Sequence, residues 1–160
     1  MVNNMEKSLC FLFLVLVCNC CSAFSVDRNF SSCDGKYSVV DAGSGSAFLV
    51  SNGSKKLIRL GYSADGGAID QKHSLLAVYG TPKIIDAQYP QAIVISIFRN
   101  LNDPRRVSRM IGGGGVYDIA FSLDGKFLVV DHKFGTLIID IRKNKSYLAD
   151  SKSLKVIKCG

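Results

Sequence analysis

The sequence contains no tryptophan and only two histidines, His73 and His132. Its aromatic residues do not alternate with basic ones, so the stacking platforms that bind single-stranded nucleic acids are missing, and we expect no nucleic-acid partner. Neither histidine has a partner four residues away or a cysteine companion, so we expect no zinc site and no other metal.

A catalytic set is missing as well. Asp131 or Asp140 could be combined with His132 and a serine, but no nucleophile elbow surrounds a serine. The run Gly112 to Gly115 lacks the Lys-Ser/Thr ending of a phosphate-binding loop and precedes a strand, so it indicates a flexible or close-packed loop. We therefore expect no enzyme, no catalytic residue and no cofactor.

No apolar run is long enough to span a membrane. The run Leu9 to Val17 has nine residues, whereas a transmembrane helix needs roughly 20. Lys7 precedes it and the small residues Cys21-Ser22-Ala23 follow it. This pattern predicts a signal peptide over residues 1–23, export to the periplasm and no membrane span after cleavage. A retained anchor is one alternative, and lipid attachment at Cys18, Cys20 or Cys21 is another.

Four of the six cysteines fall within the signal peptide, which leaves Cys33 and Cys159 in the mature chain. An even pair in an exported domain predicts a disulfide. A bridge that closes so long a loop stabilises the fold by roughly 4–5 kcal/mol in the chain-entropy model. A nucleophilic or metal-binding thiol is the alternative, with only Lys158 as a nearby basic partner.

Residues 24–160 have the length of one domain. The net charge of +7 survives cleavage because Glu6 and Lys7 cancel. Such a domain could meet an acidic protein, an anionic lipid or a glycan, and the sequence leaves a homodimer open.

Short apolar runs separated by glycine-rich turns predict an all-β fold. We expect strands at Tyr37–Val40, Ala47–Val50, Lys56–Leu60, Leu75–Tyr79, Ala92–Phe98, Val116–Phe121, Phe127–Asp131 and Thr136–Ile141, and a last one at Leu154–Ile157. Asn52-Gly53, Asp65-Gly66-Gly67 and Asp124-Gly125 are expected turns. One helical turn is expected within Asp103 to Met110.

An internal repeat relates the segment from Leu60 to Gly67 to the segment from Ile119 to Lys126. In each, a Ser-x-Asp-Gly sequence is expected to reverse the chain between two strands. The run from Phe121 to Val130, followed by Gly135 to Ile141, resembles a blade of a WD40 or TolB-type β-propeller. The resemblance implies antiparallel meanders. A full ring needs at least four blades of about 40 residues, so we expect an incomplete propeller or a sandwich tied by the disulfide.

The last 50 or so residues also resemble the periplasmic immunity proteins that bacteria use against peptidoglycan-amidase effectors of type VI secretion. The matching residues are Gly114-Gly115, Ser122-Leu123-Asp124-Gly125, His132 to Gly135, and Lys158-Cys159. The resemblance implies a protein that binds the amidase and blocks its active site with an inserted loop. That loop is Asp131, His132, Lys133, Phe134, Gly135 and Thr136. This sequence has Phe134-Gly135-Thr136 where the family is richer in serine.

Two surface segments are therefore candidate partner-binding sites. The first is the hairpin tip just described, where Phe134 either anchors in a partner or folds back over its own hairpin. The second is a basic loop with Arg105, Arg106, Ser108 and Arg109. The alternative function is a non-catalytic, propeller-like envelope module that holds a glycan or another protein.

Overall fold

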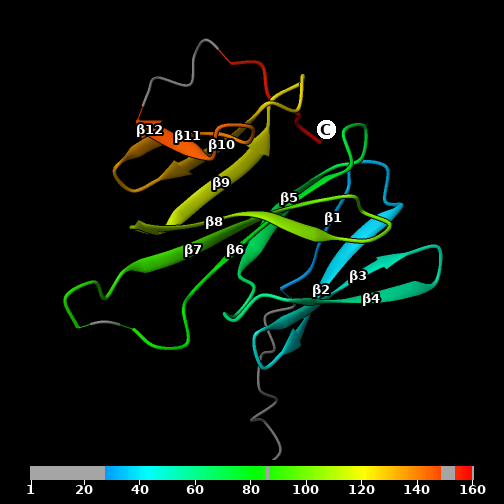
Figure 1. Ribbon diagram of the computed structural model, residues 1–160, viewed down its shortest axis with the longest axis horizontal. Coiled ribbons are helices and arrows are strands. Elements are labelled where there is room, and N and C mark those ends of the chain that lie inside the picture. The colour runs from blue at the N-terminus through cyan, green and yellow to red at the C-terminus, as the bar shows by residue number, and fades with distance from the viewer. Residues whose placement is uncertain (1–27, 86, 149–153, 160) are drawn as a thin grey trace, which may run out of the picture.

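The computed structural model describes residues 28–85, 87–148 and 154–159. The predicted signal peptide, residues 1–23, lies outside the described residues. Within them the chain forms three four-stranded sheets, each an antiparallel meander whose strands follow one another in sequence order (Figure 1). No helix occurs in the described ranges, and so none there is long and apolar enough to cross a membrane.

The sheets occupy successive parts of the chain. The first contains β1 (Phe30–Ser31), β2 (Tyr37–Gly43), β3 (Ser46–Ser51) and β4 (Ser54–Arg59). The second contains β5 (Gly66–Asp70), β6 (Leu75–Gly80), β7 (Ala92–Arg99) and β8 (Arg105–Gly113). The third contains β9 (Val116–Phe121), β10 (Phe127–His132), β11 (Gly135–Asp140) and β12 (Lys145–Leu148).

The middle sheet is covered on both faces. Along β6, Leu76 and Val78 belong to the core shared with the first sheet, whereas Leu75 and Ala77 belong to the core shared with the third. Because both faces are buried, β6 and β7 read as nearly continuous apolar runs rather than as alternating ones. The two cores therefore stack the three sheets in series, as blades.

The first strand of each sheet lies on the inner side of the stack. β5 contacts both β1 and β9. Gly66 and Gly67 open β5, and a Cβ on Gly67 would lie 2.1 Å from the Ala77 carbonyl oxygen. The turn predicted at Asp65-Gly66-Gly67 is therefore wrong, because these glycines permit close packing of an inner strand instead of a chain reversal.

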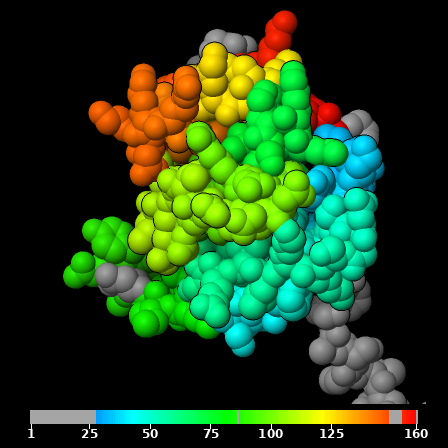
Figure 2. Space-filling model, turned by 45° about the vertical axis from the view of Figure 1, so that its right-hand side comes forward, coloured from blue at the N-terminus to red at the C-terminus, as the bar shows by residue number. Residues whose placement is uncertain are grey.

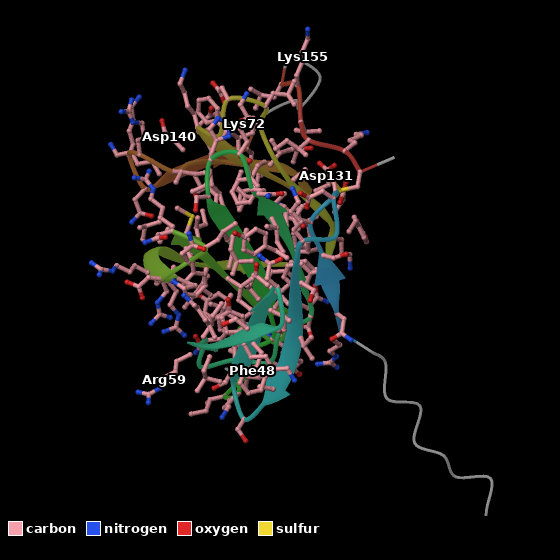
Figure 3. All side chains as sticks on the ribbon, turned by 90° about the vertical axis from the view of Figure 1, so that its right-hand side faces the viewer. Phe48, Arg59, Lys72, Asp131, Asp140 and Lys155 are labelled. Carbon is pink, nitrogen blue, oxygen red and sulfur yellow. A yellow bond between two sulfur atoms is a disulfide. The ribbon has the colours of Figure 1, made fainter. Side chains whose placement is uncertain are left out.

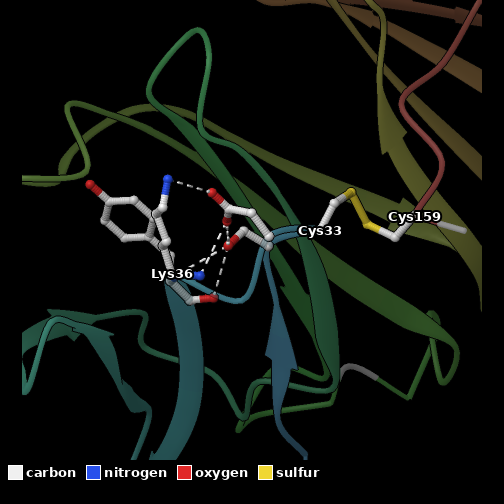
Figure 4. Close-up of a disulfide and its surroundings, with 6 residues drawn as sticks. Cys33, Lys36 and Cys159 are labelled. Carbon is white, nitrogen blue, oxygen red and sulfur yellow. Dashed lines mark hydrogen bonds and ion pairs between the residues drawn. A yellow bond between two sulfur atoms is a disulfide. The ribbon is translucent and has the colours of Figure 1, made fainter.

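The C-terminal segment runs beside β9. The Leu123 amide donates to the Lys155 carbonyl, and the Ile157 amide donates to the Phe121 carbonyl, at 2.9 and 2.8 Å. The strand predicted at Leu154–Ile157 is thus a short bridge between Val156 and Ser122. The disulfide between Cys33 and Cys159 is confirmed, with the Cα atoms 4.9 Å apart (Figure 4). It joins the first sheet to a segment held by the third.

Two turns with nearly the same sequence join the first two strands of the first sheet and of the third sheet. In Ser122 to Phe127, the Ser122 hydroxyl donates to Asp124 at 2.7 Å and accepts the Phe127 amide at 3.0 Å. Ser32 to Tyr37 repeats these bonds at the same lengths (Figure 4). The segment from Leu60 to Gly67 is therefore not the equivalent of the third-sheet turn, and the predicted internal repeat is wrong in its first member, which is Ser32 to Tyr37.

The hydrogen bonds of these turns stabilise ionised carboxylates. The Ser122 hydroxyl, followed by the Lys126 amide, lowers the pKa of Asp124 to about 2. The Ser32 hydroxyl and the Lys36 amide lower the pKa of Asp34 in the same way. Both turns are thus charged, hydrogen-bonded connections at neutral pH.

The segment after Asp103 contains no helical turn. Residues 105–113 form β8, which pairs with β7 from Arg99↔Arg105 to Ala92↔Gly113. The basic loop predicted here is therefore an edge strand. The sequence of this segment does not indicate a strand, because an edge strand exposed on most of its length needs no regular apolar alternation.

The predicted fold class is confirmed. The chain is all-β and built from antiparallel meanders. Of the two predicted arrangements, the structure has the incomplete, propeller-like one, with three blade-like sheets tied by one disulfide. Figure 3 shows Asp131 and Lys155 toward one end of the molecule, with Phe48 and Arg59 of the first sheet toward the other.

Candidate functional site

The hairpin between β10 and β11 is tighter than the six-residue loop expected from the sequence. His132 pairs with Gly135, so Asp131 and His132 end β10, and Gly135 and Thr136 begin β11. Only Lys133 and Phe134 form the turn. Gly135 has a φ of 123°, a conformation that side chains rarely adopt.

Side-chain hydrogen bonds hold the base of this hairpin. The Thr136 hydroxyl donates to the Asp131 carboxylate at 2.6 Å, and the Phe134 amide donates to His132 Nδ1 at 3.2 Å. The Lys133 amide donates to the Gly115 carbonyl at 3.1 Å. These bonds connect the tip both to its own strands and to the β8–β9 turn.

Phe134 is the apolar feature of the tip, and 63% of its surface is exposed. Its ring lies against Gly114, where a Cβ would come within 2.9 Å of it. The His132 ring stands edge-on to it at 6.1 Å between centroids, and Lys133 Nζ lies 6.0 Å from its centroid. Phe134 therefore leans toward the neighbouring β8–β9 turn and keeps most of its surface free.

The basic segment lies on the edge strand β8, whose far end approaches the hairpin. Arg105, Arg106 and Arg109 are exposed along β8, and the far end of that strand reaches the glycines beside Phe134. Arg105 pairs with exposed Asp103 at 3.0 Å. Ser108 points inward and donates to the Asn144 side chain at 2.6 Å. The basic segment thus lies on β8, and the hairpin tip lies beside the end of that strand.

Sequence reasoning missed the apolar surface beside the hairpin. Tyr89, Ile111 and Leu148 are all exposed, Ile111 by 72%. Together with Phe134 they line two adjoining hollows between the second and third sheets. Exposed apolar patches of this kind mark interaction sites more often than scattered apolar residues do. The signal in the sequence is Ile111 followed directly by four glycines.

One of the two histidines, His73, is held in a turn by an aspartate. His73 Nδ1 lies 2.6 Å from the buried carboxylate of Asp70, in the turn that begins β6. Its ring packs on Gly125, where a Cβ would come within 2.4 Å, so the pair links the turns of the second and third sheets. Across the described ranges, no group of three or more His, Cys, Asp or Glu side chains could hold a metal ion.

No protein-family model and no curated protein matches the sequence. Solved structures match the chain at low sequence identity, and the following three are among them. A protein of unknown function from Bacteroides thetaiotaomicron has a TM-score of 0.51 at 10% identity, over 78% of this chain and 31% of that one. A candidate 6-phosphogluconolactonase from Bacteroides fragilis has a TM-score of 0.47 at 16% identity, over 82% and 37%. The dihydro-heme d1 dehydrogenase NirN has a TM-score of 0.32 at 15% identity, over 78% and 36%.

The chain spans about a third of the length of the proteins it matches. At these identities the likeness concerns the fold alone.

Proposed function

We propose that this chain is an exported immunity protein that binds a toxic cell-wall amidase in the periplasm and occludes its active-site cleft. The observation that carries the proposal is the hairpin tip, where Lys133 and Phe134 project from a two-residue turn with the Phe134 ring largely exposed. Exposed aromatic side chains are common anchors in protein interfaces.

The order of the hairpin supports this role. Its tip is held by the bonds from Thr136 to Asp131 and from Lys133 to Gly115 before any partner arrives. A segment that is already ordered loses little conformational entropy on binding, so more of the contact energy appears as affinity. Occlusion itself requires shape and position from the inhibitor, and no chemistry.

Charge supports a partner with an acidic cleft. The chain carries a net charge of +7, and the tip adds Lys133 to an apolar ring. A cleft with carboxylates around an apolar pocket complements this combination, and the overall charge speeds the encounter.

Co-expression tests the proposal. In this experiment the full-length chain is co-expressed with the product of the gene next to its own, and both proteins are directed to the periplasm. We expect the two proteins to co-purify, and we expect the chain to suppress hydrolysis of purified peptidoglycan by that product. If the two proteins neither co-purify nor show suppressed hydrolysis, the proposal is wrong.

Variants at the tip assign the interface. Phe134→Ala and Lys133→Ala should each weaken the complex by about 2 kcal/mol if they are central contacts. Leu57→Ala is the matched control because Leu57 is similarly exposed, at 56%, but lies on β4 of the first sheet. Equal affinities for all three variants would place the interface elsewhere on the chain.

A further inference from the structure

A groove lies between the second and third sheets, at the foot of the hairpin. Two hollows of about 620 and 260 Å³ form it, and they share Ile111 and Gly112–Gly114. Tyr89 and Phe134 stand at one end, and Leu148 lines the other. In Figure 2 the lime segment that contains β8 appears between the orange part of the third sheet and the cyan to turquoise first sheet.

The groove is bounded by two sheet edges. β8 pairs with β7 alone, and β12 pairs with β11 alone, among the residues that the structure describes. The hydrogen bond from Ser108 to Asn144 joins β8 to the turn before β12. Edge strands present backbone donors and acceptors to which another extended chain can pair.

The floor of the groove contains glycines that the fold does not require. A Cβ on Gly112 or Gly113 would meet no atom within 4 Å, and neither residue has a positive φ. Gly114 differs, because its φ is 86° and a Cβ would lie 2.9 Å from the Phe134 ring. Glycine inside a strand weakens it, and often marks a place where another molecule approaches the backbone closely.

Charge favours an acidic partner over a second copy of this chain as the occupant of the groove. β8 and β12 carry Arg105, Arg106, Arg109 and Lys145 and no acidic residue. Alternation along the strand places Arg109 on the same face as Ile111 and Gly113. A second copy of the chain would bring like charges together, whereas an acidic partner would be attracted.

We propose that this groove receives an extended segment of a partner protein in which apolar side chains alternate with carboxylates. The apolar side chains fill the hollows between Tyr89, Phe134 and Leu148. The segment's backbone lies over Gly112 and Gly113 along the edge of β8, and a carboxylate of the segment faces Arg109. The site goes beyond occlusion of a cleft, because the chain here receives a segment of its partner.

A labelled peptide tests the site without knowledge of the natural partner. The probe is a fluorescein-labelled ten-residue peptide that alternates glutamate with leucine and phenylalanine, measured by fluorescence anisotropy. We expect it to bind the oxidised, exported chain, more weakly as salt is raised. Gly112→Val and Gly113→Val, made singly, should each weaken binding at least about tenfold, because they raise the floor of the groove.

Gly115→Val is the matched control. Gly115 also has open space around its Cβ position and no positive φ, but it does not line the groove. It should bind the peptide as the unmodified chain does. The Gly112→Val and Gly113→Val chains should unfold at the same or higher denaturant concentration, since both positions lie in β8 and valine suits a strand better than glycine.

Three results would overturn the proposal. The first is equal peptide affinity for the chain with Gly112→Val, Gly113→Val or no substitution. The second is equal binding of a peptide with lysine in place of glutamate. The third is binding of phosphatidylglycerol vesicles, but not of the peptide, through the same glycines. Lys133→Ala separates this site from the hairpin function, because Lys133 does not line the groove. It should lower inhibition of the amidase and leave peptide binding unchanged.

Discussion

The inner and outer strands of the same three sheets differ in almost every physical respect. The inner strands β1, β5 and β9 pack in series, and the disulfide and the C-terminal segment lie beside them. The outer strands β4, β8 and β12 are largely exposed and rich in lysine and arginine. The inner strands, together with the disulfide, therefore hold the three sheets together and stabilise the fold. The edges of the outer strands remain free for recognition.

Removal of the disulfide should have the largest effect on the inner side. Cys33→Ser combined with Cys159→Ser opens a loop of 126 residues, which should lower the free energy of unfolding by roughly 4–5 kcal/mol. Urea denaturation under oxidising conditions measures this. A change below 1 kcal/mol would show that the β9 bridge alone holds the C-terminal segment.

A substitution in the stacked cores should have the next largest effect on the free energy of unfolding. Leu76→Ala removes a fully buried side chain of the middle sheet and should cost about 2–5 kcal/mol. Leu57→Ala removes an exposed side chain of β4 and should cost less than about 0.5 kcal/mol. Comparable losses at the two positions would remove the distinction between the buried strands and the exposed outer strands.

The paired turns should make a smaller, pH-dependent contribution. The folded pKa of Asp124 is about 2, below the ordinary 3.8, so the carboxylate stabilises the fold above pH 4, and this stabilisation is lost as the pH falls toward 2. Asp124→Asn should flatten the dependence of the unfolding midpoint on pH in that window. Asp34→Asn should act in the same direction, and an unchanged profile in both variants would contradict the turn assignment.

Much of the fold could be predicted from the sequence, because alternating or continuous apolar runs identified the strands with at least one buried face. The missed strands β1, β5, β8 and β12 each lack that signal. β1 has two residues, β5 begins with two glycines, and β8 and β12 are exposed edges. Each of them pairs with a strand beside it in the chain, so the neighbouring strand specifies it and no apolar pattern of its own does.

The two turns show a similar limit. The turn sequence SCDGKY at residues 32–37 matches SLDGKF at residues 122–127 at four of six positions. Cys33 within the first turn also predicts the disulfide, so the sequence did not single this segment out as a repeat. The hairpin tip could be located because it lies between two strong strands. The groove could not, since Gly112 and Gly114 look alike in sequence and differ only in φ and surroundings.

The most direct test of the account compares stability with inhibition in one variant, Phe134→Ala. Its side chain is exposed at the hairpin tip, so the free energy of unfolding should change by less than about 0.5 kcal/mol. Inhibition of peptidoglycan hydrolysis by the adjacent gene product should fall by at least about tenfold, in line with the loss of a central contact. Unchanged inhibition by a stably folded Phe134→Ala chain would contradict the account.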